Sequence, residues 1–190
     1  MHSASRIIPQ LMILFHSLGG TAVECVIDKK SFTVFQPADK AKGDVVLLAS
    51  PEDAPTHDRI SWPGEYDIGG ISIRGIGHDE GERVSYVIDN DGVRCAFISS
   101  PVHQWTDYEY ELLGNIDVLC IPADDAEMVQ KIVDEVDPRV LIPLPTKDEK
   151  MFAEVLKVNG AQAKGAEDEF KVKGSLPQEG REVVVLKSRK

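Results

Sequence analysis

A few histidines and carboxylates are the side chains of this sequence that could do chemistry. His16 with Ser17 follows an apolar segment, and the string His78-Asp79-Glu80 lies further along the chain. Imidazole nitrogens and carboxylate oxygens hold zinc, and zinc turns a bound water into a nucleophile near neutral pH. The same residues also occur without a ligand, because hydrogen bonds alone satisfy a buried imidazole. We favour this structural role for both strings and leave a weak divalent-metal or substrate contact open at His78.

The remaining reactive residues give weaker signals. Glu52 and Asp53 could act as oxygen ligands for a hard cation, but Ca²⁺ takes about 6–8 oxygens and the neighbouring sequence does not supply them. His103, close to Trp105, is expected in a loop. Three cysteines lie singly in apolar runs, which indicates buried thiols rather than disulfides, a metal site or a nucleophile; they are Cys25, Cys95 and Cys120.

The first half of the chain is expected to position these residues on strands. Its short segments are rich in β-branched and aromatic residues and are separated by turns, as in antiparallel sheets. The strands are predicted at residues 12–16, 21–27, 31–35, 44–49, 68–76, 84–88 and 93–98. Hairpin turns are expected at 28–30 and 90–92, and Gly69-Gly70 is interpreted as a bend within a strand.

Helices alternate with strands in the second half. Thr106 and Glu109 have the spacing of a capping box, and Gly114 is placed to end the short helix that they begin. A buried strand at 117–121, a helix at 124–136 and a strand at 139–142 predict a parallel β-α-β crossover. Further elements are expected at 147–158 (helix), 170–172 and 182–186 (strands).

Several strings in this order resemble the metallo-β-lactamase superfamily, in particular the short zinc-dependent hydrolases akin to ascorbate-6-phosphate lactonases. The most distinctive is WPGEYDIGGISIRGI at residues 62–76; the others are DVVLLAS (44–50), YVIDNDGVRCAFIS (86–99), LLGNIDVLCIP (112–122), DPRVLIPL (137–144) and SLPQEGREVVVL (175–186). The resemblance implies an α/β fold, the four-layer αββα sandwich with two mixed sheets. It covers a single domain over 12–190 and leaves 1–11 as an N-terminal extension.

Active members of that family bind one or two zinc ions and hydrolyse their substrates with a metal-bound hydroxide. The resemblance places the family's His-x-His-x-Asp-His ligands on residues that mostly cannot hold zinc. These positions are Ser50, Glu52, Ala54 and Pro55, with Ser100 in place of the bridging aspartate and Pro145 in place of the late histidine. The retained histidines are His16 and His78. An insertion that brings His57 and Asp58 into reach is a less favoured alternative.

Two functional hypotheses follow from this loss. We favour a protein without catalytic residues, metal or cofactor that serves as a binding or assembly module, with an unknown small-molecule ligand. The alternative is a divergent metal-dependent hydrolase of a small lactone or phosphoester with a reduced ligand set drawn from His16, His78, Glu52 and His57. Metal content after purification without chelator distinguishes the two.

Charge and hydropathy restrict the partners. The chain of 190 residues has a net charge of −11, so a nucleic-acid backbone or an anionic membrane surface would repel it. Residues 107–137 hold ten acidic residues and one basic residue, which indicates a solvated acidic face or, less favoured, a docking site for a basic partner. No apolar run reaches the about 20 residues of a membrane span, and we expect a cytoplasmic protein. Self-association into a homo-oligomer is a further expectation, by analogy with the family.

Overall fold

The fold begins with a tight meander of three strands. The computed structural model describes residues 12–54, 56–172 and 176–189 of the chain. The predicted N-terminal extension and Pro55 lie outside this part. The strands β1 (Ile13–Gly19), β2 (Ala22–Ile27) and β3 (Lys30–Val34) pair antiparallel. Asp28 and Lys29 both have positive φ, 46° and 79°, as the tight turn of a two-residue hairpin requires. The predicted turn is therefore confirmed.

This meander is the centre of a six-stranded sheet with the order β13-β1-β2-β3-β4-β5. Its other strands are β4 (Val45–Leu47), β5 (Arg59–Ile60) and β13 (Phe170–Val172). The strand β13 follows all three α-helices in the sequence and pairs antiparallel with β1, so this sheet joins distant parts of the chain.

A seven-stranded sheet packs against the first, with the order β14-β11-β10-β9-β8-β7-β6. Its strands are β6 (Gly64–Ile68), β7 (Ile71–His78), β8 (Arg83–Asn90), β9 (Val93–Phe97), β10 (Val118–Pro122), β11 (Val140–Leu144) and β14 (Glu182–Val183). A small separate pair joins β12 (Ala166–Glu167) to β15 (Val185–Leu186). One prediction was wrong here, because Gly69 and Gly70, with φ of +64° and +86°, form the turn of a β6–β7 hairpin instead of a bend in one long strand.

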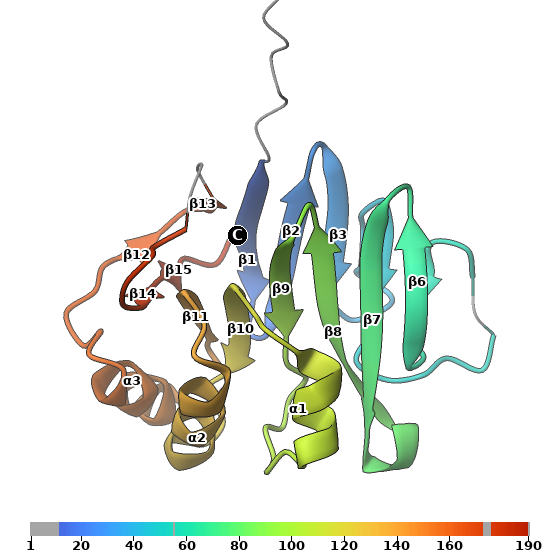
Figure 1. Cartoon of the computed structure of the whole chain (residues 1–190). Helices are drawn as coiled ribbons and strands as arrows, with labels where there is room; N and C mark the ends of the chain where they lie inside the picture. The colour runs from blue at the N-terminus through green and yellow to red at the C-terminus, as the bar shows by residue number, and fades with distance from the viewer. Residues whose placement is uncertain (1–11, 55, 173–175, 190) are drawn as a thin grey trace, which may run out of the picture.

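Three α-helices lie outside this sandwich (Figure 1): α1 (Asp107–Leu113), α2 (Ala126–Val136) and α3 (Glu149–Val158). A 3₁₀ turn, η1 (Asp79–Gly81), connects β7 to β8. Apolar residues of all three α-helices pack on outward residues of β7 to β11, so these helices cover the seven-stranded sheet. Two mixed sheets with helices outside confirm the predicted α/β sandwich of the family. In the described ranges the α-helices form one outer layer, on the seven-stranded sheet, and none covers the six-stranded sheet. None of the described helices is long and apolar enough to cross a membrane.

Side chains fasten the short helix α1 at both ends, at its start from its own capping box and at its end from the sheet. Thr106 and Glu109 form the predicted capping box at its start. At its end, Arg74 of β7 donates to the carbonyl oxygen of Leu112 at 3.0 Å, and Arg94 of β9 donates to that of Leu113 at 2.8 Å. These carbonyls have no partner within the helix, so the arginines satisfy them and place positive charge at the negative end of the helix.

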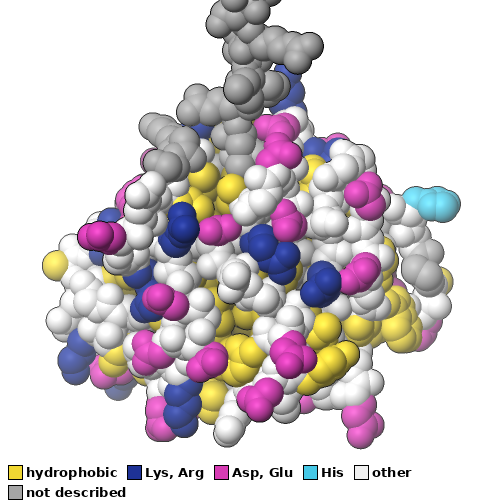
Figure 2. Space-filling view, in the orientation of Figure 1, with side chains coloured by type: hydrophobic (Ala, Val, Ile, Leu, Met, Phe, Trp, Pro, Cys, Tyr) yellow, Lys and Arg dark blue, Asp and Glu magenta, His cyan; other side chains and the backbone are white. Residues whose placement is uncertain are grey.

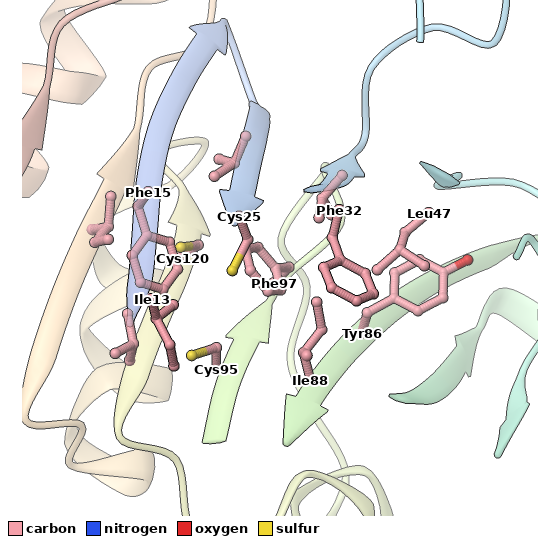
Figure 3. Packing of buried hydrophobic residues seen from close by; sticks show 14 of the residues in the cluster. Ile13, Phe15, Cys25, Phe32, Leu47, Tyr86, Ile88, Cys95, Phe97 and Cys120 are labelled. Carbon is pink, nitrogen blue, oxygen red and sulfur yellow. The ribbon is translucent and has the colours of Figure 1, made fainter. Parts of the chain in front are cut away.

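The main core fills the space between the two sheets. Figure 3 shows its aromatic rings and cysteines, among them Phe15, Phe32, Phe97 and Tyr86, all without solvent exposure. The three cysteines are free and buried, and burial raises the pKa of each thiol well above its ordinary value. They are therefore packing residues, as predicted.

Tyr86 also connects the two sheets through its hydroxyl group. Its oxygen lies 2.6 Å from the carbonyl oxygen of Leu48 and 3.0 Å from that of Ile60. We expect Tyr86→Phe to lower the free energy of unfolding by about 1–2 kcal/mol, because it removes the hydroxyl donor from the buried carbonyl of Leu48. The carbonyl of Ile60 keeps the backbone N–H of Leu48 at 2.9 Å. Chemical denaturation measures the loss. Tyr108→Phe is the control, since Tyr108 is 66% exposed, and equal stability of the two variants would contradict this role.

Candidate functional site

Three parallel strands end at the same edge of the seven-stranded sheet. The strands β9, β10 and β11 run parallel to one another, and they are followed by Ser100, Asp124 and Pro145. Ligands of α/β sheets bind outside the carboxyl ends of such strands. The residues here line a pocket of about 560 Å³, which we call the edge pocket; its lining is Gly20, Thr21, Ser100, Asp124, Pro145, Thr146, Lys147 and Asp148.

Asp124 organises one wall of the edge pocket. Its Oδ2 accepts hydrogen bonds from the hydroxyl group of Ser100 and from the backbone N–H of Val102, both at 2.9 Å. The loop after β9 is thereby tied to the loop after β10. Two predicted cleft residues, Ser100 and Pro145, thus lie in one pocket, while Asp124 was not identified from the sequence.

The other predicted cleft residues do not line this pocket. Ser50 and Ala54 are exposed, and Pro55 lies outside the described residues. Glu52 accepts a hydrogen bond from Arg59 at 3.0 Å through Oε1, and its backbone carbonyl accepts one from the indole of Trp62 at 3.0 Å. Glu52 is therefore part of a local network that fixes the loop between β4 and β6.

The loop that contains Glu52 does not provide a zinc site. A zinc site needs at least three protein ligands, and Glu52 alone among the family positions offers a competent oxygen. Its Oε2 is buried and has no hydrogen-bond partner in the described structure, but the guanidinium of Arg59 at 3.0 Å from Oε1 supplies the positive charge there. His57, the alternative ligand, is exposed. The one group of three or more His, Cys, Asp or Glu side chains with metal-binding spacing in the described ranges lies elsewhere.

His16 lies away from the edge pocket and has a structural role. Its Nδ1 is 3.2 Å from a carboxylate oxygen of Glu24, and its Nε2 is 3.2 Å from one of Glu169. Arg189 adds an ion pair to Glu24 at 3.4 Å and donates its backbone N–H to the carbonyl of Ser17. His16 therefore joins β1 and β2 to segments near the end of the chain.

His78 is the centre of a polar cluster beneath α1, which we call the histidine–glutamate cluster: His78, His103 and Glu109. One oxygen of Glu109, Oε1, lies 2.6 Å from Nδ1 of His78 and 3.1 Å from Nε2 of His103. The three ligand atoms lie within 4.8 Å of one another. Sequence reasoning missed this group, because it placed His103 in a loop and assigned Glu109 only to the helix cap.

The hydrogen bonds of this cluster favour protons over a metal ion. Arg83 donates to Nδ1 of His103 at 3.3 Å, so we assign the ring proton of His103 to Nε2, where it is donated to Glu109. A metal on Nε2 would take the place of that proton and leave Nδ1, still facing Arg83, unprotonated. The pKa of His78 is lowered, chiefly by burial, which disfavours the charged form of its ring. Burial also acts to raise the pKa of Glu109, but hydrogen bonds from the Thr106 backbone, His78 and His103 outweigh it and lower the pKa to about 2.

A serine, a histidine and a carboxylate are also hydrogen-bonded in the order found in a catalytic triad: Ser85, His78 and Glu109. The hydroxyl of Ser85 lies 2.8 Å from Nε2 of His78, whose other nitrogen faces Glu109. Ser85 has no solvent exposure, however, and its oxygen accepts the backbone N–H of Ser99 at 3.0 Å. A substrate cannot reach this hydroxyl, so the arrangement is a satisfied buried network.

Comparisons with known proteins agree on the fold. A family model described as "Beta-lactamase superfamily domain" matches residues 21–145. The structure is similar to a protein assigned as a Zn-dependent hydrolase of the metallo-β-lactamase superfamily from Thermotoga maritima, with a TM-score of 0.73, 22% identity, 93% of this chain and 100% of that chain covered. A protein assigned as a metal-dependent hydrolase from Parabacteroides distasonis has a TM-score of 0.65 and 14% sequence identity, with 94% of each chain covered. The metallo hydrolase Igni18 from Ignicoccus hospitalis has a TM-score of 0.61 and 14% sequence identity, with 87% of this chain and 100% of that chain covered. Among curated proteins, none matches significantly.

Proposed function

This chain belongs to the beta-lactamase superfamily, and we propose that it uses the metallo-β-lactamase fold to bind a ligand without hydrolysing it. The observation that carries the proposal is the set of side chains at the positions where the family resemblance places zinc ligands. Of the six family ligand positions named above, Glu52 alone has a side chain that binds zinc well, and Arg59 neutralises it. Losing ligands one after another weakens a metal site cumulatively, since affinity depends on their number and fixed geometry.

The edge pocket supplies the chemistry for binding. Thr21, Ser100 and Thr146 bring hydroxyl groups, Lys147 brings an ammonium group, and the carboxylates come from Asp124 and Asp148. Such a lining matches a small polar molecule that carries both hydrogen-bond donors and acceptors. Six of the eight lining residues carry polar or charged side chains, so we place the ligand among small, charged or hydroxylated compounds.

The second candidate is the divergent hydrolase acting on a small lactone or phosphoester. One observation favours it: Oε2 of Glu52 is a buried carboxylate oxygen without a partner in the described residues. A cation could use that oxygen if Arg59 moved away.

Thermal unfolding with excess Zn²⁺ against EDTA tests the two candidates. We expect the midpoints to differ by less than about 1 °C. A ligand at a hundred times its dissociation constant adds about 2.7 kcal/mol, which raises the midpoint of a domain of this size by roughly 5–10 °C. Release of p-nitrophenol from phosphate esters and hydrolysis of a simple lactone, measured with and without Zn²⁺ or Mn²⁺, should stay at the rate of buffer.

Two variants locate any zinc effect that does occur. A rise that Glu52→Gln removes, together with hydrolysis, would establish the hydrolase and end the binding-module proposal. A rise that His103→Ala removes, while Glu52→Gln leaves it, would place a metal in the histidine–glutamate cluster instead.

Self-association and a cytoplasmic location remain part of the proposal. An assembly module would present its surfaces to a second copy, and free buried thiols suit a reducing compartment. Light scattering during size-exclusion chromatography gives the mass of the particle, to be compared with multiples of the chain mass of 20.9 kDa.

A further inference from the structure

A groove between the start of α1 and the helix α2 is a second concave surface, separate from the edge pocket. Its volume is about 390 Å³, and it is lined by Gln104, Trp105, Tyr110, Met128, Lys131, Asp134 and Glu135. None of these residues lines the edge pocket. A ligand of this groove would therefore bind independently of the proposed function.

Aromatic and apolar side chains form the floor of the groove. The rings of Trp105 and Tyr110 lie with centroids 5.7 Å apart at an angle of 47°. Trp105 is 5% exposed and belongs to the packed core under the helices, together with the partly buried Tyr110 and Met128. Trp105 thus supports the floor from below, and the partly exposed ring of Tyr110 is the aromatic face that can attract a cation.

Negative charge surrounds this floor. Asp134 and Glu135 are exposed, and neither has an ion-pair partner in the part of the chain that the structure describes. The one cation of the lining, Lys131, is paired with Glu127 at 3.0 Å. Figure 2 shows acidic side chains around hydrophobic ones over the lower part of the molecule, where α1 and α2 lie. The groove therefore has an excess of negative charge that is not compensated locally.

The floor also contains an unsatisfied hydrogen-bond donor. The indole N–H of Trp105 is buried and has no acceptor among the described residues. A buried donor without a partner is rare and unfavourable. Because this N–H lies in the floor of the groove and lacks a partner, its NMR signal is a sensitive reporter of any change in the packing there.

We propose that this groove binds a basic, arginine-containing segment of a partner protein. The planar guanidinium stacks on aromatic rings and forms paired hydrogen bonds with carboxylates. The partly exposed ring of Tyr110 and the carboxylates of Asp134 and Glu135 offer this combination. A nucleic acid or an anionic membrane is the wrong partner for this surface, since the same carboxylates repel phosphate groups. The acidic stretch at residues 107–137 was interpreted first as a solvated face, with a basic partner as the less favoured alternative. The proposal adopts that alternative for the part of the stretch that lines the groove.

NMR of the ¹⁵N-labelled chain tests the proposal through its two tryptophan indole signals. The probe is the peptide acetyl-Gly-Arg-Ala-Arg-Gly-amide, compared with versions in which citrulline or glutamate replaces arginine. We expect the Trp105 signal to shift with the arginine peptide alone, while the Trp62 signal, assigned with Trp62→Phe, stays in place as the internal control. Higher salt should weaken the binding, because exposed charges are screened.

Charge-removing variants complete the test. We expect Asp134→Asn and Glu135→Gln each to weaken binding about three- to five-fold, the effect of an exposed ion pair. Glu149→Gln, an exposed residue at the start of α3, removes the same charge away from the groove and should leave the affinity unchanged. The proposal is overturned if the arginine peptide shifts no Trp105 signal at millimolar concentration, if the citrulline peptide binds equally, or if Glu149→Gln has the effect of Glu135→Gln.

Discussion

Replacing Glu109 with alanine is expected to lower the free energy of unfolding by about 3 kcal/mol, because three charge-assisted hydrogen bonds, two of them partly buried, lose their acceptor together. The carboxylate of Glu109 accepts from His78, His103 and the backbone N–H of Thr106. The loss corresponds to a fall of roughly 6–12 °C in the unfolding midpoint for a domain of this size. Calorimetry or circular dichroism during heating measures it.

Glu111 supplies the matched control for this variant. It lies on the same helix, carries the same charge and is exposed. Glu111→Ala should change the midpoint by about 1 °C or less, since surface substitutions usually have effects within about 0.5 kcal/mol. If Glu109→Ala and Glu111→Ala were equally stable, the histidine–glutamate cluster would contribute nothing to the fold.

Acid is expected to destabilise the protein through the same cluster. The pKa of Glu109 is lowered from its ordinary value of 4.5 to about 2 in the folded state. A carboxylate with a lowered pKa stabilises the fold fully above its unfolded pKa and loses that contribution as the pH falls towards its folded pKa. The contribution of about 3 kcal/mol, at about 1.4 kcal/mol for each pKa unit, should therefore disappear between about pH 5 and pH 2.

Protonation of His78 also destabilises the protein, and it does so at a higher pH than protonation of Glu109. Burial lowers the pKa of His78 below 6.5 in the folded state, so the unfolded chain binds a proton first, and stability already begins to fall as the pH drops below about 6.5. The measurement is the free energy of unfolding in urea at several pH values. The slope of stability against pH should become shallower below pH 5 in Glu109→Gln and stay unchanged in Glu111→Gln. Parallel curves for the wild type and Glu109→Gln would contradict the lowered pKa.

The strands and helices were largely predictable because periodicity and turn chemistry are local signals. The capping box at Thr106 and the turn at Asp28 each depend on residues a few positions apart. The error at Gly69-Gly70 is equally local, since paired glycines suit a hairpin turn and a strand bend alike. Only the pairing of β6 with β7 distinguishes the two.

The candidate sites were less predictable because they join residues that are distant in the sequence. The family resemblance identified Ser100 and Pro145 for the edge pocket, but no signal marked Asp124, which comes from the loop between them. Likewise, the string at His78 gave no indication of Glu109, 31 residues further on. Such contacts depend on strand order, which the sequence specifies only through the whole fold.

The two arginines that fasten α1 have a consequence for the order of folding. A helix of seven residues is far below the length that is stable alone in water, so α1 can persist only after β7 and β9 have brought Arg74 and Arg94 to its end. The side of the groove between α1 and α2 that Tyr110 contributes therefore forms late, after the long-range pairing of the sheet. A nascent or partly unfolded chain would lack the groove, and a partner that binds there would select completed molecules.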